Sequence, residues 1–121
     1  MRSTREVIDA HLQRRKAGDL EGDLEENYAP DVVVLTWGEG AQRGKDAIRR
    51  CADVLNTYLP EGDYTYHQVL VEDAYGMLQW TGRTKSTQVH DGADSYVVRG
   101  GRIVAQTIHY AARHAADGAQ Q

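Results

Sequence analysis

The 121-residue chain has one cysteine, two prolines, no phenylalanine and no long hydrophobic segment. With Cys51 as its only cysteine it can form no intrachain disulfide, and a zinc site would need histidine and carboxylate ligands. No apolar run is long enough to cross a bilayer, and residues 1–6 lack the apolar stretch of a signal peptide. We therefore expect a cytoplasmic protein that binds no metal and no membrane.

Positive charge is also scarce, with 14 Lys and Arg against 18 Asp and Glu and a net charge of −4. The one basic cluster, Arg14, Arg15 and Lys16, lies at the end of an expected helix, where cations suit the helix dipole. Because no basic stripe with interleaved aromatic residues exists, we expect no nucleic-acid binding. The chain does have 7 Tyr and 2 Trp, whose apolar rings and polar tips suit a half-wet cavity as well as a sheet surface.

Helical patterns occupy most of the first half of the chain. A capping box over residues 3–6 (Ser-Thr-Arg-Glu) starts one helix, which ends at Gly18, and Asp19 starts a short second helix. Apolar residues at helical spacing between Ala47 and Tyr58 predict a third helix, after a loop bracketed by glycines. The N-terminal half therefore predicts three helices.

Strand patterns dominate the second half. Runs of β-branched and aromatic residues predict strands over residues 32–37, 64–72, 75–87, 93–99 and 102–110. Helices gathered in one half and strands in the other are typical of an α+β fold, with helices packed on one face of a curved antiparallel sheet. The length fits a single domain over residues 1–112, followed by a disordered tail over residues 113–121.

Both faces of this expected sheet carry apolar residues. Alternating positions with few charges place one group on the outer face: Val69, Val71, Val97, Ile103 and His109. A sheet that is apolar on both sides usually covers its outer face with another subunit. We therefore expect a homodimer joined through the outer sheet face.

Asp94 is the most unusual residue of the strand pattern. Side chains alternate along a strand, so Asp94 shares a face with Tyr96 and Val98. If that face is the core, burial raises the pKa of Asp94 and suits the residue to proton transfer near neutral pH. Alternatively, Asp94 follows the turn at Asp91 and caps the wet end of its strand.

His11 lies on the apolar stripe of the first expected helix, four residues after Val7. A single histidine on such a face is more often a satisfied core residue than a catalyst. From the residues alone, its role stays open.

Four segments in order resemble the nuclear transport factor 2-like superfamily: Ala-Gly-Asp-Leu-Glu-Gly at 17–22, Tyr-Ala-Pro-Asp-Val-Val at 28–33, Gly-Lys-Asp-Ala-Ile-Arg at 44–49 and Gly-Arg-Ile at 101–103. They span about 110 residues, the size of one domain. This superfamily includes ketosteroid isomerases and SnoaL-type polyketide cyclases. The resemblance implies a cone-shaped sheet with the helices on its concave face, but the fold hosts unrelated chemistries.

The resemblance also implies a site. Asp94 and His11 fall where ketosteroid isomerases have the aspartic acid and the tyrosine of their oxyanion hole. Their general base, an aspartate on the first strand, corresponds to Thr36, whose hydroxyl cannot shuttle protons as a carboxylate does. Steroid isomerisation by that base is therefore not expected. The Asp94–His11 pair could still run acid/base chemistry, with one group giving a proton and the other taking it.

These observations predict a cofactor-independent isomerase, cyclase or lyase acting on a small hydrophobic carbonyl or polyketide-like molecule. Asp94 and His11 are its catalytic candidates. Trp37 and Trp80 suit either a cavity wall or packing between the layers. The expected pocket residues are Tyr28, Thr36, Trp37, Trp80, Tyr96, Gln106, Ile108 and Tyr110. The alternative is a non-catalytic ligand-binding or dimeric assembly module with the same cavity.

Overall fold

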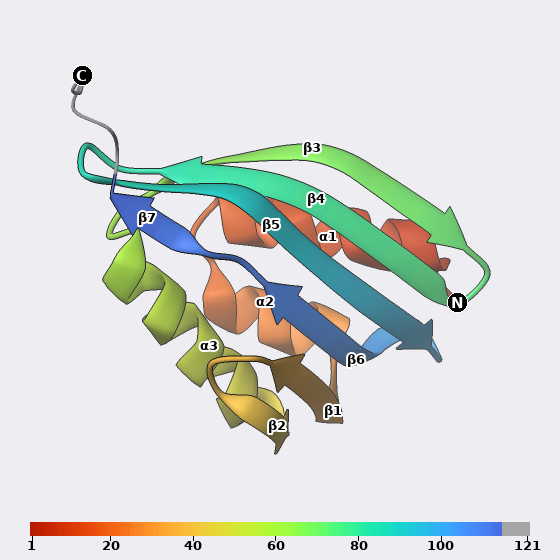
Figure 1. Cartoon of the computed structure of the whole chain (residues 1–121). Helices are drawn as coiled ribbons and strands as arrows, with labels where there is room; N and C mark the ends of the chain where they lie inside the picture. The colour runs from red at the N-terminus through yellow and green to blue at the C-terminus, as the bar shows by residue number, and fades with distance from the viewer. Residues whose placement is uncertain (115–121) are drawn as a thin grey trace.

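A computed structural model of the chain describes residues 1–114, which form three helices and seven strands (Figure 1). None of the helices within these residues is long and apolar enough to span a lipid bilayer. In chain order the elements are α1 Thr4–Lys16, α2 Leu20–Asn27, β1 Tyr28–Thr36, β2 Gly40–Arg43, α3 Lys45–Tyr58, β3 Asp63–Glu72, β4 Tyr75–Arg83, β5 Thr87–Arg99, β6 Arg102–His109 and β7 Ala112–His114.

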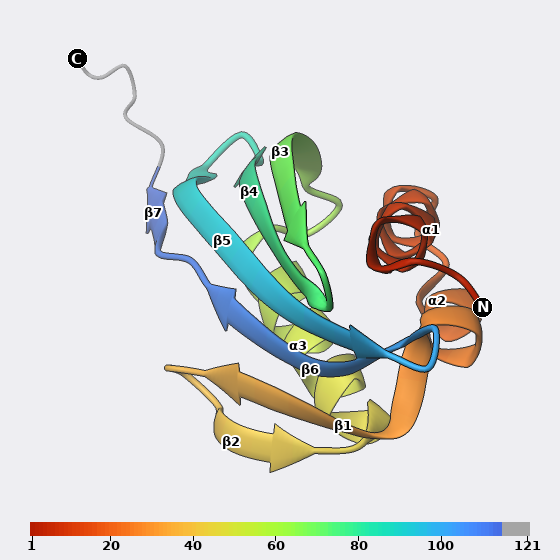
Figure 2. The same ribbon diagram turned by 90° about the vertical axis from the view of Figure 1, so that its right-hand side faces the viewer.

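The strands form one curved sheet in the order β2-β1-β6-β5-β4-β3, and β7 pairs with part of β5. Figure 2 shows all three helices on the same side of this sheet. The predicted α+β fold is therefore confirmed, with one correction. The sheet is mixed rather than antiparallel, because β1 and β6 pair in parallel. These two strands are far apart in the chain, so no tight hairpin turn forces them to run in opposite directions.

The predicted helix boundaries are confirmed at α1 and α2. The Ser3 hydroxyl accepts from the Glu6 backbone N–H, and the Glu6 carboxylate accepts from the Ser3 N–H, which completes the capping box. Gly18 has a φ of 74°, and Asp19 caps the start of α2. The apolar face of α1, including His11, is buried against the sheet. Packing of this face against the sheet therefore places the His11 side chain in the interior.

The outer-face prediction was wrong for three of its five residues. Val69 and Val71 pack against the core, and Ile103 is fully buried in it. The cause in β3 is a register shift between Tyr66 and Gln68, where the pairing with β4 skips a residue and alternation changes phase. The outer face instead carries exposed apolar residues that strict alternation did not assign, namely Leu35, Leu70, Tyr75 and Met77.

Two short strands had no counterpart in the sequence prediction. β2 was expected to be a loop and pairs with β1, while β7 occupies the start of the expected tail and pairs with β5. Both have three or four residues and little apolar character, so their extended form depends on the long partner strand rather than on local preference. The rest of the expected tail, residues 115–121, lies outside the described part of the chain.

Gly92 on β5 positions one wall of the interior. It pairs with Trp80 on β4, and a Cβ atom built at Gly92 would come within 2.3 Å of two ring carbons of Trp80. The absence of a side chain lets the indole lie against the β5 backbone. From there the ring nitrogen of Trp80 reaches Asp94, two residues further along β5.

Candidate functional site

A cavity of about 410 Å³ lies between the concave face of the sheet and the helices. Its size is in the range of small-molecule sites. Every residue named above as catalytic or pocket-forming lines this cavity, including both tryptophans. Further lining residues that were not predicted include Arg15, Cys51, Leu55, Tyr64, Tyr66 and Leu78. The fold therefore brings together residues from α1, α3 and six strands around one space.

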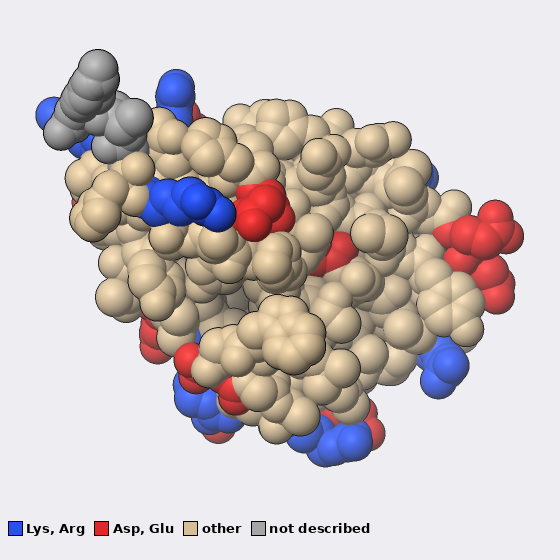
Figure 3. Space-filling model, viewed as in Figure 1, with Lys and Arg blue, Asp and Glu red and all other residues tan. Residues whose placement is uncertain are grey.

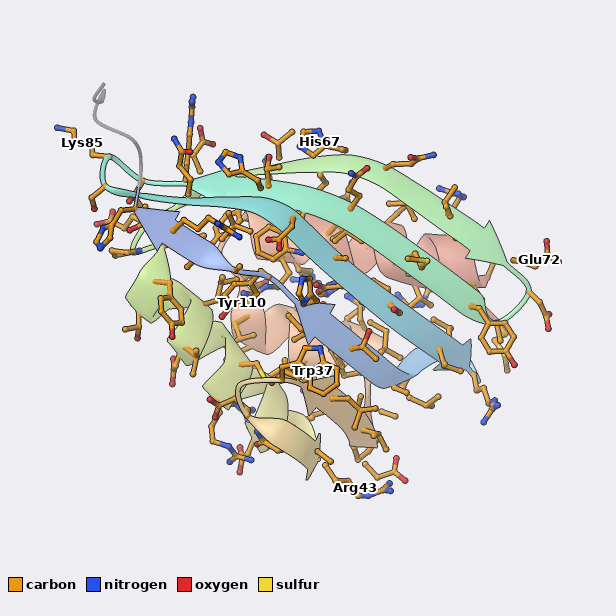
Figure 4. All side chains as sticks on the ribbon, viewed as in Figure 1. Trp37, Arg43, His67, Glu72, Lys85 and Tyr110 are labelled. Atoms are coloured by element: carbon orange, nitrogen blue, oxygen red, sulfur yellow. The ribbon has the colours of Figure 1, made fainter. Side chains whose placement is uncertain are left out.

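Aromatic residues form the rim of the cavity. Trp37 follows β1 and is 92% exposed, and Tyr110 follows β6 (Figure 4). Tyr110 meets Tyr58 of α3 edge to face, with the ring centroids 6.2 Å apart. Thr36 also lines the cavity, but its hydroxyl accepts from the Glu39 backbone N–H at 2.9 Å. Its hydroxyl therefore stabilises the turn after β1.

Asp94 lies in the middle of β5 and is 8% exposed. Its two carboxylate oxygens accept hydrogen bonds from the Trp80 ring nitrogen and the Gln106 side-chain amide, each at 3.0 Å. The Gln106 carbonyl in turn accepts from the Tyr28 hydroxyl. The structure thus differs from the alternative in which Asp94 caps a wet strand end.

Burial raises the pKa of Asp94 above its usual range, since desolvation penalises the carboxylate. The hydrogen bonds from Trp80 and Gln106, and the charge of His11, act in the opposite direction and are weaker. Each carboxylate oxygen has a second lone pair. A protonated Asp94 can therefore keep both hydrogen bonds and still donate its proton to a molecule in the cavity.

His11 belongs to a second buried network that also borders the cavity. Its Nδ1 lies 2.7 Å from Asp23 Oδ2, and its Nε2 lies 3.1 Å from the Tyr96 hydroxyl. Asn27 donates to the other oxygen of Asp23 at 2.9 Å and accepts from the Arg2 guanidinium at 2.7 Å. The Asp23 carboxylate can only accept, so it holds a proton on Nδ1 and leaves Nε2 of a neutral His11 as the acceptor.

Tyr96 connects the two networks. It lies two residues after Asp94 on the same face of β5, and its ring meets His11 edge to face at 5.4 Å between centroids. Burial, followed by the nearby Asp94 charge, raises the pKa of the Tyr96 hydroxyl well above its usual value. The hydroxyl therefore stays protonated and can donate to Nε2 of His11.

Asp23 was missed by the sequence reasoning, although a signal existed. On α2, Leu20, Asp23, Leu24 and Asn27 follow the spacing of one helix face. Asp23 and Asn27 are fully buried on it, so a carboxylate and an amide interrupt an apolar stripe. Such a carboxylate needs a buried partner, and that partner is His11.

Polar groups in this interior are satisfied. Within residues 1–114, every buried side-chain nitrogen or oxygen has a hydrogen-bond partner. In the same part of the chain, no three His, Cys, Asp or Glu side chains come together as a metal site would require. A ligand would therefore meet groups that are already oriented.

The raised pKa of Asp94 predicts a pH dependence of stability. The folded chain holds the Asp94 proton more tightly than the unfolded chain, so this contribution is complete below about pH 4, the ordinary titration range of aspartate. It is lost as the pH rises through the raised pKa. Urea unfolding of the wild type and Asp94→Asn across pH should show the wild type losing stability relative to the variant over that window. If the stability of the wild type minus that of Asp94→Asn stayed constant or rose with pH, the effect of burial on Asp94 would be contradicted.

Comparison with protein families gives one match. The family described as SnoaL-like domain matches residues 8–106, which is most of the chain. No curated protein matches significantly.

Several solved structures share the fold at low sequence identity. An NTF2-like protein of unknown function from Burkholderia pseudomallei is 18% identical with a TM-score of 0.75, and the match covers 92% of each chain. A candidate polyketide cyclase from Sinorhizobium meliloti is 19% identical with a TM-score of 0.68, covering 85% of this chain and 93% of the other. TerC, co-crystallised with polyporic acid, is 17% identical with a TM-score of 0.67, covering 89% of this chain and 91% of TerC. At these identities the likeness concerns the fold and not an activity.

Proposed function

The chain belongs to the SnoaL-like domain family, and on that premise we propose that it is a cofactor-independent acid/base enzyme. Its reaction is an isomerisation, cyclisation or elimination of a small hydrophobic carbonyl or polyketide-like molecule in the cavity. One observation carries the proposal, namely that a buried acid and a carboxylate-oriented histidine line the same cavity. Among the solved structures of this fold, the candidate polyketide cyclase and TerC with polyporic acid agree with a ligand of this kind.

The proton donor in this mechanism is Asp94. In its protonated form it donates to the carbonyl oxygen of the substrate, and this proton transfer offsets the charge that develops as the adjacent carbon loses a proton. Trp80 and Gln106 hold the carboxyl group in place during the transfer. Burial of Asp94 raises its pKa and so favours the neutral form of the acid.

The proton acceptor is His11, acting through Tyr96. The substrate carbon gives its proton to the Tyr96 oxygen while the Tyr96 proton passes to Nε2 of His11, 3.1 Å away. The resulting imidazolium is stabilised by the Asp23 carboxylate, 2.7 Å from Nδ1. The substrate becomes an enol, Asp94 becomes a carboxylate, and the reverse transfers at a different carbon complete an isomerisation.

The proposal can be tested without knowing the natural substrate. β-Tetralone is a small aromatic ketone whose acidic carbon-bound protons exchange with heavy water, and proton NMR follows that exchange. Binding is measured first by calorimetry. The enzyme should accelerate exchange of the bound ketone over buffer, whereas a ketone that binds without accelerated exchange would favour a ligand-binding module.

A ligand-binding module remains the second candidate, and one observation favours it. Both oxygens of Asp94 already have hydrogen-bond partners, so the site is complete as a rigid receptor. A binding module needs no proton transfer, and its affinity should tolerate the loss of an ionisable group. The variants described in the Discussion separate the two functions on this basis.

The outer sheet face supports a second proposal, that the chain forms a homodimer. Leu35, Met77 and Leu70 are about half exposed and lie in one cross-strand row of this face, in which Thr107 of β6 and Ser95 of β5 stand between Leu35 and Met77. Uncharged atoms cover most of this face (Figure 3). A stable interface there should bury on the order of 1,200 Å² or more in total.

A lysine on this face should prevent association. Met77→Lys places a charge beside Leu70 in this row, so sedimentation equilibrium at micromolar concentration should show a dimer for the wild type and a monomer for the variant. Asn56→Lys on the exposed side of α3 adds the same charge away from the sheet and should leave the dimer intact. A monomeric wild type would overturn the proposal.

A further inference from the structure

Arg15 is a cation at the cavity wall with no ionic partner among residues 1–114. Its side chain lines the cavity and is only partly exposed. No hydrogen bond or ion pair of the Arg15 guanidinium exists within residues 1–114. Five guanidinium N–H donors are therefore available beside a space of about 410 Å³.

The other half-buried arginines behave differently. Arg14 binds Asp19 and Glu26, Arg49 binds Glu21 and Asp46, and Arg2 donates to Asn27. An arginine that loses water contact usually gains such partners, because desolvation of an unpaired charge is unfavourable. Arg15 is the exception among the half-buried arginines of the described chain, and it is the one at the cavity.

Arg15 lies close to His11 on α1. It lies four residues after His11, so both side chains project from the same helix face about 6 Å apart along the axis. Arg15 also acts electrostatically on Tyr28, Tyr64, Tyr66 and Asp94, and at each of the four it opposes the effect of burial. The guanidinium thus faces the aromatic interior.

The other charged groups at the cavity bear on whether an anionic ligand can bind beside Arg15. Asp94 is buried with a raised pKa, which reduces its negative charge, and Asp23 lies behind His11 with both of its oxygens engaged. Glu39 also lines the cavity and, after burial, its charge is a further cause of the raised pKa of Cys51. A negatively charged ligand group would meet its cation at Arg15, the one Lys or Arg side chain that lines the cavity within residues 1–114.

We propose that Arg15 binds a carboxylate of the ligand, so that the substrate is a small aromatic or polyketide-like acid with its anionic group about one helical turn from His11. That this ligand is a substrate rests on the proposed function, whereas the preference of Arg15 for a carboxylate does not. A carboxylate can take two parallel hydrogen bonds from a guanidinium, which fixes the orientation of the ligand as well as adding affinity. Arg15 is a specificity residue in this account and takes no part in proton transfer.

The test compares two aromatic probes that differ in charge, naphthoate and naphthamide, titrated into the full-length protein by calorimetry. The wild type should bind naphthoate roughly 10-fold or more tightly than naphthamide, and Arg15→Gln should abolish that preference while retaining naphthamide affinity. Arg14→Gln is the matched control, because it removes the same charge from the neighbouring residue, whose partners lie outside the cavity. The control variant should keep the preference for naphthoate.

The inference would be overturned by equal affinity of the wild type for both probes, or by an unchanged preference in Arg15→Gln. An equal loss in Arg15→Gln and Arg14→Gln would also overturn it, because the preference would then reflect overall charge. None of these results bears on ketone exchange. A failure of the exchange assay with the naphthoate preference intact would reject the enzyme and keep the carboxylate site.

Discussion

Asp94→Asn is expected to lower the rate of β-tetralone exchange by roughly 10²-fold or more, the usual contribution of a positioned acid or base. Asparagine keeps the shape of the side chain but has no ionisable proton. Its carbonyl can accept from Trp80, and its amide can donate to the Gln106 carbonyl once the Gln106 amide flips, after which the Gln106 nitrogen donates to the Tyr28 oxygen. Ketone affinity should therefore stay within a few-fold of the wild type, measured by calorimetry alongside NMR exchange.

Asp91→Asn is the matched control for this substitution. Asp91 lies on the same strand, is exposed and does not itself line the cavity, although its partner His109 does. Asparagine at this position can still accept from the Ala111 N–H, so the control removes only the charge. Its exchange rate should equal that of the wild type. An Asp94→Asn protein that binds the ketone and exchanges it at the wild-type rate would exclude Asp94 as the proton donor.

His11→Gln is expected to lower the exchange rate at least as strongly, by roughly 10²-fold or more, because it removes the acceptor behind Tyr96. Glutamine can still contact Asp23 and Tyr96, but its amide nitrogen cannot take up a proton. The same NMR assay measures the loss, at ketone concentrations that saturate the site. Urea unfolding should confirm that the variant is folded.

His67→Gln provides the corresponding control on the protein surface. His67 is exposed on β3, contacts Thr81 at 2.8 Å and does not line the cavity. It should exchange the ketone at the wild-type rate. Equal losses in the His11 and His67 variants would indicate a general effect of histidine removal and would contradict a specific role for His11.

Local rules were sufficient for the parts of the fold that depend on local chemistry. The capping box at Ser3, the turn at Gly18 and the cap at Asp19 all use hydrogen bonds within a few residues. The β5–β6 hairpin follows from Gly100 and Gly101, both with positive φ. These features were predictable because the sequence contains both partners of each interaction side by side.

Features that depend on distant partners were not predictable in the same way. The parallel pairing of β1 with β6 joins strands separated by most of the chain. The register shift after Tyr66 depends on how β3 fits β4, and it moved Val69 and Val71 to the inner face. Period-two alternation assumes an unbroken ladder, which a bulge removes.

The residues of the candidate site also differ in whether they could be predicted from the local sequence. Asp94 and His11 could be named because each places a polar group in an apolar pattern, and resemblance to a known superfamily added weight. Asp23 also sits in an apolar pattern, but its importance follows only from its contact with His11, twelve residues earlier. Arg15 was explained by the helix dipole, which accounts for its neighbours Arg14 and Lys16 but not for a guanidinium at the cavity wall.

The most direct test of the acid/base account is the exchange rate of bound β-tetralone in heavy water, measured by proton NMR for the wild type, Asp94→Asn and His11→Gln at saturating ketone. The account predicts wild-type exchange well above the buffer rate and a loss of roughly 10²-fold or more in each variant, with affinity held within a few-fold. Exchange by the wild type no faster than buffer, although the ketone is bound, would contradict it, as would two variants that exchange as fast as the wild type.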